Sequence, residues 1–194
     1  MTKLIDEGEV AQLLADYGPG QRREAILDIS TTTFDEWRDK LGNLSTRRGE
    51  AVLCIQRPDG KILLHTKRFY PQGIFRLPTG GVNPGETVLA GAVRETKEET
   101  GLEISVERFL GTVEYEFRNH QRRFFYVSYV FVLRADNSLP EVHDPNEAIT
   151  DFRYVPPAEI PKIAAQLREI SGHWGDWGRF RALPHEIVAE GLGV

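Results

Sequence analysis

The sequence predicts an α/β layered fold with a mixed β-sheet and a helical extension at the N-terminus. Residues 1–47 carry apolar side chains at helical spacing, whereas short β-prone runs separated by turn residues begin at residue 48. Farther along, predicted helices alternate with predicted strands. Hairpins join antiparallel strands and helical crossovers join parallel ones, so a chain with both kinds of connection is expected to form a mixed sheet.

The N-terminal extension is predicted to be helical, with an interruption at the Gly-Pro-Gly turn 18–20. Apolar residues recur before this turn at the spacing of one helix face: Val10, Leu13, Leu14 and Tyr17. Thr33 and Glu36 resemble a capping box that starts a second helix. We expect a structural role or a homodimer contact, because the apolar stripe needs a covering surface from this chain or from a second copy.

The main domain is expected to span residues 48–170. Apolar runs at 51–56 and 62–66 flank a Pro-Asp-Gly turn and predict a hairpin. The further predicted elements are a helix over 86–100 capped by Gly101, strands over 109–117, 124–133 and 152–155, and a helix over 160–170.

Composition and charge restrict the possible partners. A length of 194 residues suits a single domain. The net charge of −5 argues against non-specific binding to nucleic acid or to an anionic membrane, but a metal ion can still attract a phosphorylated substrate. No run approaches the roughly 20 apolar residues of a membrane span, and the acidic, polar start of the chain argues against a signal peptide. We therefore expect a cytoplasmic protein with no membrane partner.

Cys54 is the only cysteine, which excludes an intrachain disulfide and a cysteine-rich zinc site. It lies in an apolar, β-prone run. We predict a buried, inert thiol there.

Three carboxylates fall on one face of the predicted helix 86–100. Glu95, Glu98 and Glu99 stand at positions i, i+3 and i+4, a spacing at which like charges repel. Apolar residues occupy the opposite face: Val88, Leu89, Ala92 and Val93. Such a cluster suits Mg²⁺ or Mn²⁺, which prefer oxygen ligands, although a solvated acidic face has the same spacing.

Two neighbouring features support a site at this helix. Arg94 can pair with Glu86 or Glu98 and hold these carboxylates in place, because its guanidinium group is bidentate. The Gly-rich loop that contains Gly80 and Gly81 lets the backbone approach a ligand closely.

Residues 80–102 resemble the Nudix box, G-x5-E-x7-R-E-U-x-E-E-x-G-U. Every fixed position is matched: Gly80, Glu86, Arg94, Glu95, Glu98, Glu99 and Gly101. Leu102 fills the last apolar position, while Thr96 replaces a bulky apolar residue, which we expect to perturb packing mildly. The resemblance covers about residues 48–160, including Thr79 where many relatives have Gly.

The resemblance implies a Nudix-type α/β/α sandwich that hydrolyses a phosphoanhydride in a nucleoside diphosphate linked to another moiety. By similarity, Glu98 and Glu99 are direct ligands of Mg²⁺ or Mn²⁺, Glu95 is a further ligand or the general base, and the Thr79 carbonyl faces the metal. Arg94 is a residue of the catalytic site that orients its carboxylates. The other orienting positions are Glu86, Gly80, Gly81 and Gly101.

Family members often take the base or an extra ligand from a later loop. The best candidate is Glu147, with Asp144 second, and an ordinary solvated acid is the alternative for both. Basic residues near the Gly-rich loop and near a hairpin turn are candidates for phosphate binding or, alternatively, for solubility: Arg68, Arg76 and Arg118, then Lys67, Arg122 and Arg123.

The tail, residues 171–194, is aromatic and Gly-rich. We expect it to pack on the domain or on a partner subunit, because Trp anchors cores and interfaces. Folding over the site to stack a base is the alternative.

Two other functions compete with hydrolysis. A ligand-sensing or interaction module built on the same fold more often has decayed catalytic carboxylates, which are intact here. Isoprenoid-diphosphate isomerase chemistry normally needs a catalytic cysteine, and Cys54 lies outside the box.

Overall fold

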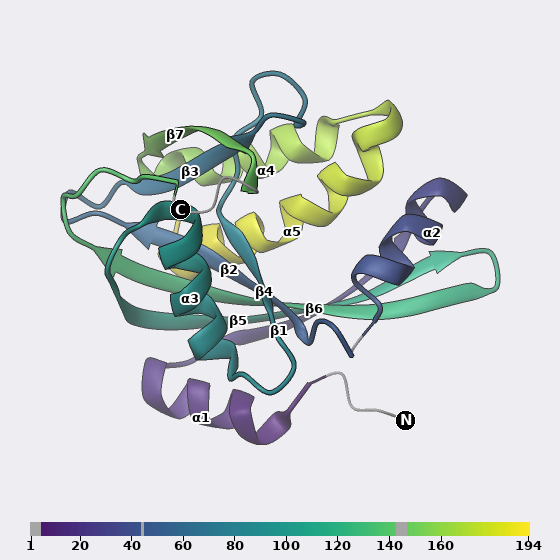
Figure 1. Ribbon diagram of the computed structural model, residues 1–194, viewed down its shortest axis with the longest axis horizontal. Helices are drawn as coiled ribbons and strands as arrows, with labels where there is room; N and C mark the ends of the chain where they lie inside the picture. The colour runs from purple at the N-terminus through teal and green to yellow at the C-terminus, as the bar shows by residue number, and fades with distance from the viewer. Residues whose placement is uncertain (1–4, 44, 143–146) are drawn as a thin grey trace.

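A mixed seven-stranded sheet forms the centre of the protein in the computed structural model, which describes residues 5–43, 45–142 and 147–194 (Figure 1). The strands are β1 (Gln21–Asp28), β2 (Gly49–Gln56), β3 (Ile62–Lys67), β4 (Thr79–Val82), β5 (Ile104–Asn119), β6 (Arg122–Ala135) and β7 (Ile149–Val155). Their order is β1-β5-β6-β2-β3-β7, and β4 pairs with β2. The pairs β1–β5 and β2–β6 are parallel and the other pairs are antiparallel, which confirms the predicted mixed sheet.

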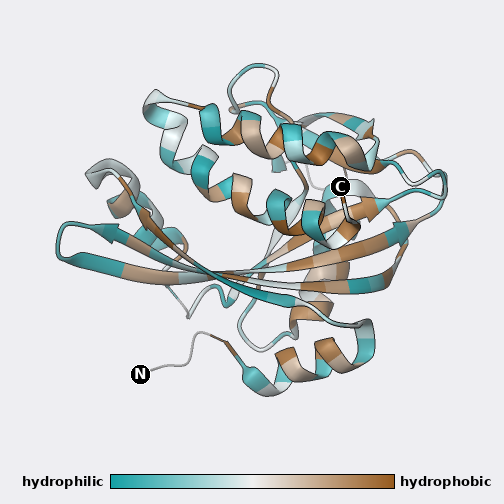
Figure 2. Cartoon of the chain, turned by 180° about the vertical axis from the view of Figure 1, so that it is seen from behind, coloured by the Kyte–Doolittle hydropathy of each residue, from teal (hydrophilic) through white to brown (hydrophobic). Residues whose placement is uncertain are grey.

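Helices cover both faces of this sheet. They are α1 (Glu7–Tyr17), α2 (Thr31–Lys40), α3 (Val88–Thr100), α4 (Ile160–Glu169) and α5 (Gly175–Leu192), with short 3₁₀ turns at Pro157–Glu159 and Gly172–Trp174. Seen from behind, α1 lies across the sheet from α4 and α5 (Figure 2). Within the described residues, no helix is both long and apolar enough to cross a membrane.

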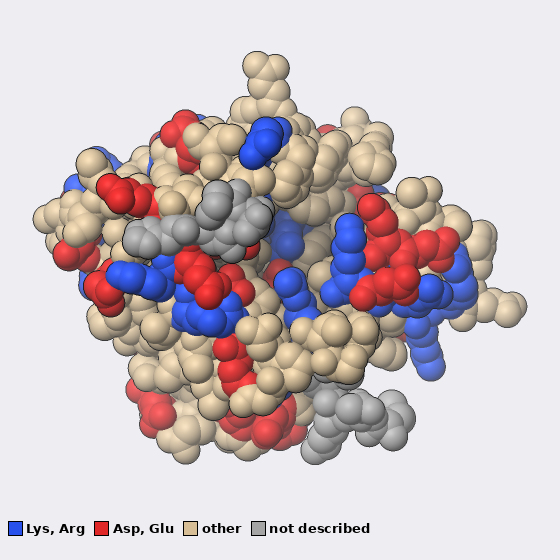
Figure 3. Space-filling model, viewed as in Figure 1, with Lys and Arg blue, Asp and Glu red and all other residues tan. Residues whose placement is uncertain are grey.

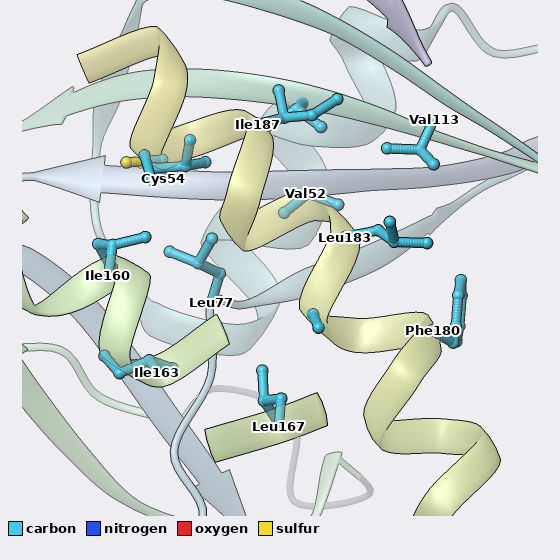
Figure 4. Close-up of a cluster of buried hydrophobic side chains, with 14 of the residues drawn as sticks. Val52, Cys54, Leu77, Val113, Ile160, Ile163, Leu167, Phe180, Leu183 and Ile187 are labelled. Carbon is cyan, nitrogen blue, oxygen red and sulfur yellow. The ribbon is translucent and has the colours of Figure 1, made fainter. Parts of the chain in front are cut away.

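Two hydrophobic clusters fill the space between the layers. Val52 and Cys54 of β2 face α2, α4 and α5, and Figure 4 shows this cluster with Ile160 and Ile187 of the two C-terminal helices. The intervening residue Leu53 faces α1 and α3 in the second cluster. This alternation along one fully buried strand produces the expected α/β/α sandwich. Cys54 is fully buried, which confirms the predicted burial, and burial raises the pKa of its thiol to about 12.

The N-terminal extension is only partly helical, so the helical prediction for residues 1–47 is wrong between α1 and α2. Residues 21–28 form β1, whose side chains alternate between partly covered and exposed, and which pairs in parallel with β5. The strand is rich in charged residues, so the sequence lacks the alternating hydrophobic pattern that would predict it. Its pairing partner also lies far along the chain. Ser30, rather than Thr33, caps α2 and accepts the Thr33 N–H.

The tail forms α5, a helix of 18 residues that packs on the sheet and on α4. Phe180 and Ile187 are buried in the cluster shared with α4. Gly178 permits the close approach of the two helices, because a Cβ atom there would lie 2.2 Å from the carbonyl oxygen of Leu167. The tail is therefore a structural layer of this chain.

Candidate functional site: a carboxylate helix beside a basic cavity

A cavity of about 250 Å³ lies beside α3, and the basic and acidic side chains of this face gather around a hollow (Figure 3). Its basic lining residues are Arg47, Lys67, Arg76 and Arg181. Its acidic ones are Glu50, Glu95 and Glu147, and its aromatic ones are Phe69, Tyr70 and Trp177. β4 contributes Thr79, Gly80 and Gly81. Segments far apart in the sequence thus converge on one side of the carboxylate helix.

Helix α3 presents the box carboxylates to this region. Thr87 caps its start by accepting the Ala90 N–H, and Gly101 ends it in the left-handed conformation with φ of 68°, as expected for a C-cap. Thr96 is fully buried and donates its hydroxyl hydrogen to the carbonyl of Ala92 at 2.7 Å. The polar atom at this normally apolar position is therefore satisfied within the helix.

Arg94 holds the acidic residues of the box together. Its guanidinium group binds both carboxylate oxygens of Glu86 at 2.7 and 3.2 Å. It also donates to Glu95 at 2.9 Å, to Glu98 at 2.8 Å and to the carbonyl of Gly81 at 2.8 Å. The hydrogen bonds from Arg94 keep the pKa of Glu86 below its ordinary value. Arg94 therefore orients the loop and two of the three helix carboxylates at once.

Glu95 packs directly against the Gly-rich strand β4. A Cβ atom at Gly80 would lie 2.0 Å from Cγ of Glu95, so only glycine leaves room for this carboxylate. Burial raises the pKa of Glu95 above its ordinary value, while Arg94 opposes the shift. Glu95 is thus a covered carboxylate on the cavity wall, whereas the Glu98 side chain is 47% exposed.

Lys67 connects the third helix carboxylate to the later loop. Its Nζ atom lies 3.0 Å from Oε1 of Glu99 and 2.5 Å from Oε2 of Glu147. Glu99 is 1% exposed, and burial raises the pKa of its carboxyl group to about 7. Its other oxygen, Oε2, is buried, has no hydrogen-bond partner among the described residues, and lies 3.9 Å from Nδ1 of the fully buried His65. Lys67 thus links Glu147 to a carboxylate of α3, whereas Asp144 lies outside the described residues.

The box carboxylates are engaged by basic side chains in this arrangement. Glu95 and Glu98 form ion pairs with Arg94, and Glu99 forms an ion pair with Lys67. Accordingly, within residues 5–43, 45–142 and 147–194, no three His, Cys, Asp or Glu side chains converge closely enough to form a metal cluster. The donor set still suits a hard cation, because it consists of carboxylate oxygens and includes the unpartnered Oε2 of Glu99.

The opposite wall of the cavity is built on α5 and β2. Arg181 binds both oxygens of the buried Glu50 at 2.7 and 2.8 Å, and Ser128 donates to the same carboxylate at 2.7 Å. The Nε atom of Arg181 is buried and has no hydrogen-bond partner in the part of the chain that the structure describes. Arg47 lies against Gly81, where a Cβ atom would meet its guanidinium at 2.7 Å. These two arginines form a fixed positive wall.

The predicted substrate residues separate into two groups. Arg76 is 3% exposed, donates to the Tyr70 hydroxyl at 2.8 Å and to the Thr79 hydroxyl at 3.0 Å, and lines the cavity. Arg68 is exposed and does not line it. Arg118 lies on the β5–β6 hairpin and binds Glu116 at 2.9 and 3.0 Å. The structure thus brings Arg76 to the site and leaves Arg68 and Arg118 outside the cavity lining.

Arg122 and Arg123 also lie at the β5–β6 hairpin, where they pair with Asp35 and Glu116. The structure therefore leaves all three hairpin arginines paired with acids near the turn.

Several lining residues have no local signal in the sequence. Arg47, Glu50 and Arg181 belong to no motif, and only the sheet order and the packing of α5 bring them together. Trp177 belongs to the aromatic tail that the sequence marks as unusual. It contacts Tyr70 with ring centroids 4.9 Å apart, so the tail does reach the cavity as well as the core.

Comparisons with known proteins agree with this geometry. The NUDIX domain model matches residues 46–177. An ADP-ribose pyrophosphatase of Methanocaldococcus jannaschii is 36% identical over 129 residues, which are 66% of this chain and 73% of that protein. Nudix hydrolase 2 of Arabidopsis thaliana is 36% identical over 91 residues, 47% of this chain but only 28% of that protein.

An RNA pyrophosphohydrolase of Erythrobacter litoralis is 25% identical over 149 residues, 68% of this chain and 84% of that protein. The domain match covers six of the seven strands, the carboxylate helix and most of the residues that line the cavity, but not β1. The chain therefore belongs to the Nudix hydrolase family of pyrophosphohydrolases, which act on phosphoanhydride bonds.

Proposed function

We propose that this chain hydrolyses the phosphoanhydride of a nucleoside diphosphate linked to another moiety, with Mg²⁺ or Mn²⁺ as its cofactor. One observation carries the proposal: a single cavity is lined by the box carboxylate Glu95, by the loop carboxylate Glu147 and by four basic side chains. Carboxylates hold a divalent cation, and cationic side chains bind phosphate oxygens. A diphosphate placed in this cavity meets both.

The residues that would hold the cation are Glu95, Glu98 and Glu99, with the backbone carbonyl of Thr79. Bound there, the cation supplies a water molecule of lowered pKa and stabilises charge on the phosphate oxygens. Arg94 and Lys67 form ion pairs with these carboxylates and compensate their negative charge.

The chain's own groups supply the proton acceptor and the substrate contacts. Either Glu95 or Glu147, both of which line the cavity, accepts a proton from water in this proposal. Arg76 and Arg181 contact the phosphate oxygens from the far wall. Tyr70 and Trp177 offer aromatic faces on which a nucleobase stacks.

The relatives narrow the first substrates to test. The relative from Methanocaldococcus jannaschii bears the name ADP-ribose pyrophosphatase, and ADP-ribose is a nucleoside diphosphate joined to a second sugar. This similarity supports ADP-ribose as the first compound in a panel. The RNA pyrophosphohydrolase relative supports including a triphosphorylated RNA.

Cys54 argues against isomerase chemistry. Its side chain is fully buried in β2, and its raised pKa of about 12 leaves no thiolate near neutral pH. A catalytic cysteine needs access to substrate, which this position does not give.

The test is product release from ADP-ribose, nucleoside triphosphates, dinucleoside polyphosphates, nucleotide sugars and triphosphorylated RNA, with Mg²⁺ or Mn²⁺. The Glu98→Gln variant removes one proposed ligand that is half exposed and should leave the fold intact. Metal-dependent turnover that collapses in the variant supports the proposal. Folded native protein that turns over no compound, with or without metal, contradicts it and favours a binding module.

A further inference from the structure

The N-terminal helix α1 makes a direct contact with the start of the carboxylate helix. The N–H of Val88 donates to Oε1 of Glu9 at 2.5 Å. Val88 is the first residue of α3, and a helix offers no internal partner to its first N–H groups. A negative charge at this end also interacts favourably with the helix dipole. Glu9 therefore acts on α3 from 79 positions earlier in the chain.

Arg48 extends this contact to the loop before α3. Its Nη2 atom donates to Oε2 of Glu9 at 2.7 Å, and its Nη1 atom donates to the carbonyl of Glu86 at 2.6 Å. The side chains of Glu9 and Arg48 are 17% and 26% exposed. The pair is therefore largely covered from solvent, unlike the surface ion pairs that contribute little.

Glu86, whose carbonyl binds Arg48, also connects the loop to the site through its carboxylate. The carboxylate of Glu86 accepts the N–H of Asn83 at 2.7 Å and binds Arg94. Arg94 in turn binds Glu95 and Glu98. A continuous series of hydrogen bonds thus runs from α1 to two of the carboxylates that face the proposed cation.

Helix α1 has its own anchor in the core. Val10 and Leu13 are 5% exposed and pack against the sheet in the cluster shared with α3. Glu9 is therefore not the only contact that holds α1 in the described structure. A helix held in this way offers a fixed point against which the loop is aligned.

We propose that Glu9 is a positioning residue of the metal site: through Val88 and Arg48 it fixes the loop before α3, and thereby Arg94 and its two carboxylates. The proposal rests on the proposed function for the identity of the cation. It gives the N-terminal helix, which lies outside the matched residues 46–177, a role in the chemistry of the site.

The test compares Glu9→Gln with Glu7→Gln in the full chain. Both variants remove one charge from α1, but within the described residues Glu7 pairs with the exposed Arg22 and not with α3 or its loop. Mn²⁺ affinity is measured by calorimetry without substrate, and amide hydrogen exchange is followed over residues 83–92. Arg48→Met removes the other partner of the Glu9–Arg48 ion pair. It replaces Glu9→Gln in the test if that variant does not fold.

We expect Mn²⁺ affinity to fall about tenfold in Glu9→Gln and Arg48→Met, the effect typical of residues that orient metal ligands. Exchange over 83–92 should be faster in both, and Glu7→Gln should match the native chain. Unchanged exchange overturns the proposal. Faster exchange with native Mn²⁺ affinity also overturns it, because the contact is then only structural.

The two proposals fail in different ways. If the native chain binds no Mn²⁺, the metal part of the proposed function is wrong. The exchange rates then test only the contact of Glu9 with the loop: faster exchange confined to residues 83–92 shows that Glu9 holds the loop without acting on a cation, and unchanged exchange shows that it does not hold the loop.

Discussion

The ammonium group of Lys67 lies 3.0 Å from Oε1 of Glu99, a carboxylate that is only 1% exposed. The same ammonium binds Glu147, so one positive charge compensates two acids next to α3. Burying an ionised carboxylate without a partner is costly. The stability of the metal-free protein therefore depends on the ion pair between Lys67 and Glu99.

Replacing Lys67 by Met should destabilise the metal-free protein. We expect a loss of about 1–3 kcal/mol in the free energy of unfolding, the usual effect of leaving a buried polar group without its partner. Urea denaturation at pH 8 with a chelator measures it, and added Mg²⁺ should reduce the loss. Lys61→Met, which removes an exposed lysine paired with Asp59, is the control. Equal stability of the two variants would contradict the prediction.

His185 should make the protein less stable in acid. Burial lowers the pKa of its imidazole to about 3, and the cations of Arg76 and Arg181 act in the same direction. The neutral ring fits its partners: Nε2 accepts the Leu77 N–H at 3.1 Å, and Nδ1 lies 2.8 Å from the Arg181 carbonyl. The unfolded chain binds a proton near pH 6.5 and the folded chain does not, so stability is full above 6.5 and falls between 6.5 and 3.

Denaturant titrations of the native chain and of His185→Gln from pH 8 to pH 4 measure this effect. The variant lacks the titrating group, so its stability should depend less steeply on pH below 6.5. Parallel pH profiles for the two proteins would show that another group causes the acid sensitivity.

Replacing Trp177 should raise KM for the substrate more than replacing Trp174. They contact each other with ring centroids 5.3 Å apart, but only Trp177 lines the cavity within the described residues. If a nucleobase stacks there, Trp177→Ala should raise KM by about 5- to 150-fold, since base–aromatic stacking contributes about 1–3 kcal/mol. Trp174→Ala should leave KM close to the native value. Equal effects of the two changes would place the base elsewhere.

Arg94→Lys should lower turnover although it keeps the charge. A lysine ammonium cannot reproduce the planar fork with which Arg94 binds Glu86 while it also holds Glu95 and Glu98. We expect kcat to fall about 10- to 100-fold, as for other residues that orient metal ligands. Steady-state kinetics measure the loss. The control is Arg38→Lys on α2, whose exposed side chain pairs with Asp39.

Local features of the carboxylate helix follow from the sequence because they depend on residues one or two turns apart. Glu95, Glu98 and Glu99 share a helix, Arg94 reaches Glu86 and Glu98 as the spacing predicts, and Gly101 ends the helix. The mixed sheet was also predictable from the sequence, because the chain contains both predicted hairpins and predicted crossovers.

Other features depend on partners that no local pattern specifies. The charged segment 21–28 becomes a strand only because β5 extends far enough to pair with it. Strand β4 has a Gly-rich sequence of low β-propensity and forms through its pairing with β2. The β5–β6 hairpin leaves Arg118 outside the cavity lining, which its position in the sequence does not reveal.

The sequence by itself determined the family, the carboxylate helix and the kind of cofactor expected, since these lie within 23 consecutive residues of regular spacing. Only the tertiary structure decided which groups face those carboxylates. Arg181, Glu50 and Lys67 come from α5, β2 and β3, and sheet order and helix packing bring them to one cavity. The physical reason is that helix periodicity is a local property, whereas contacts across a sheet depend on the burial of the whole chain.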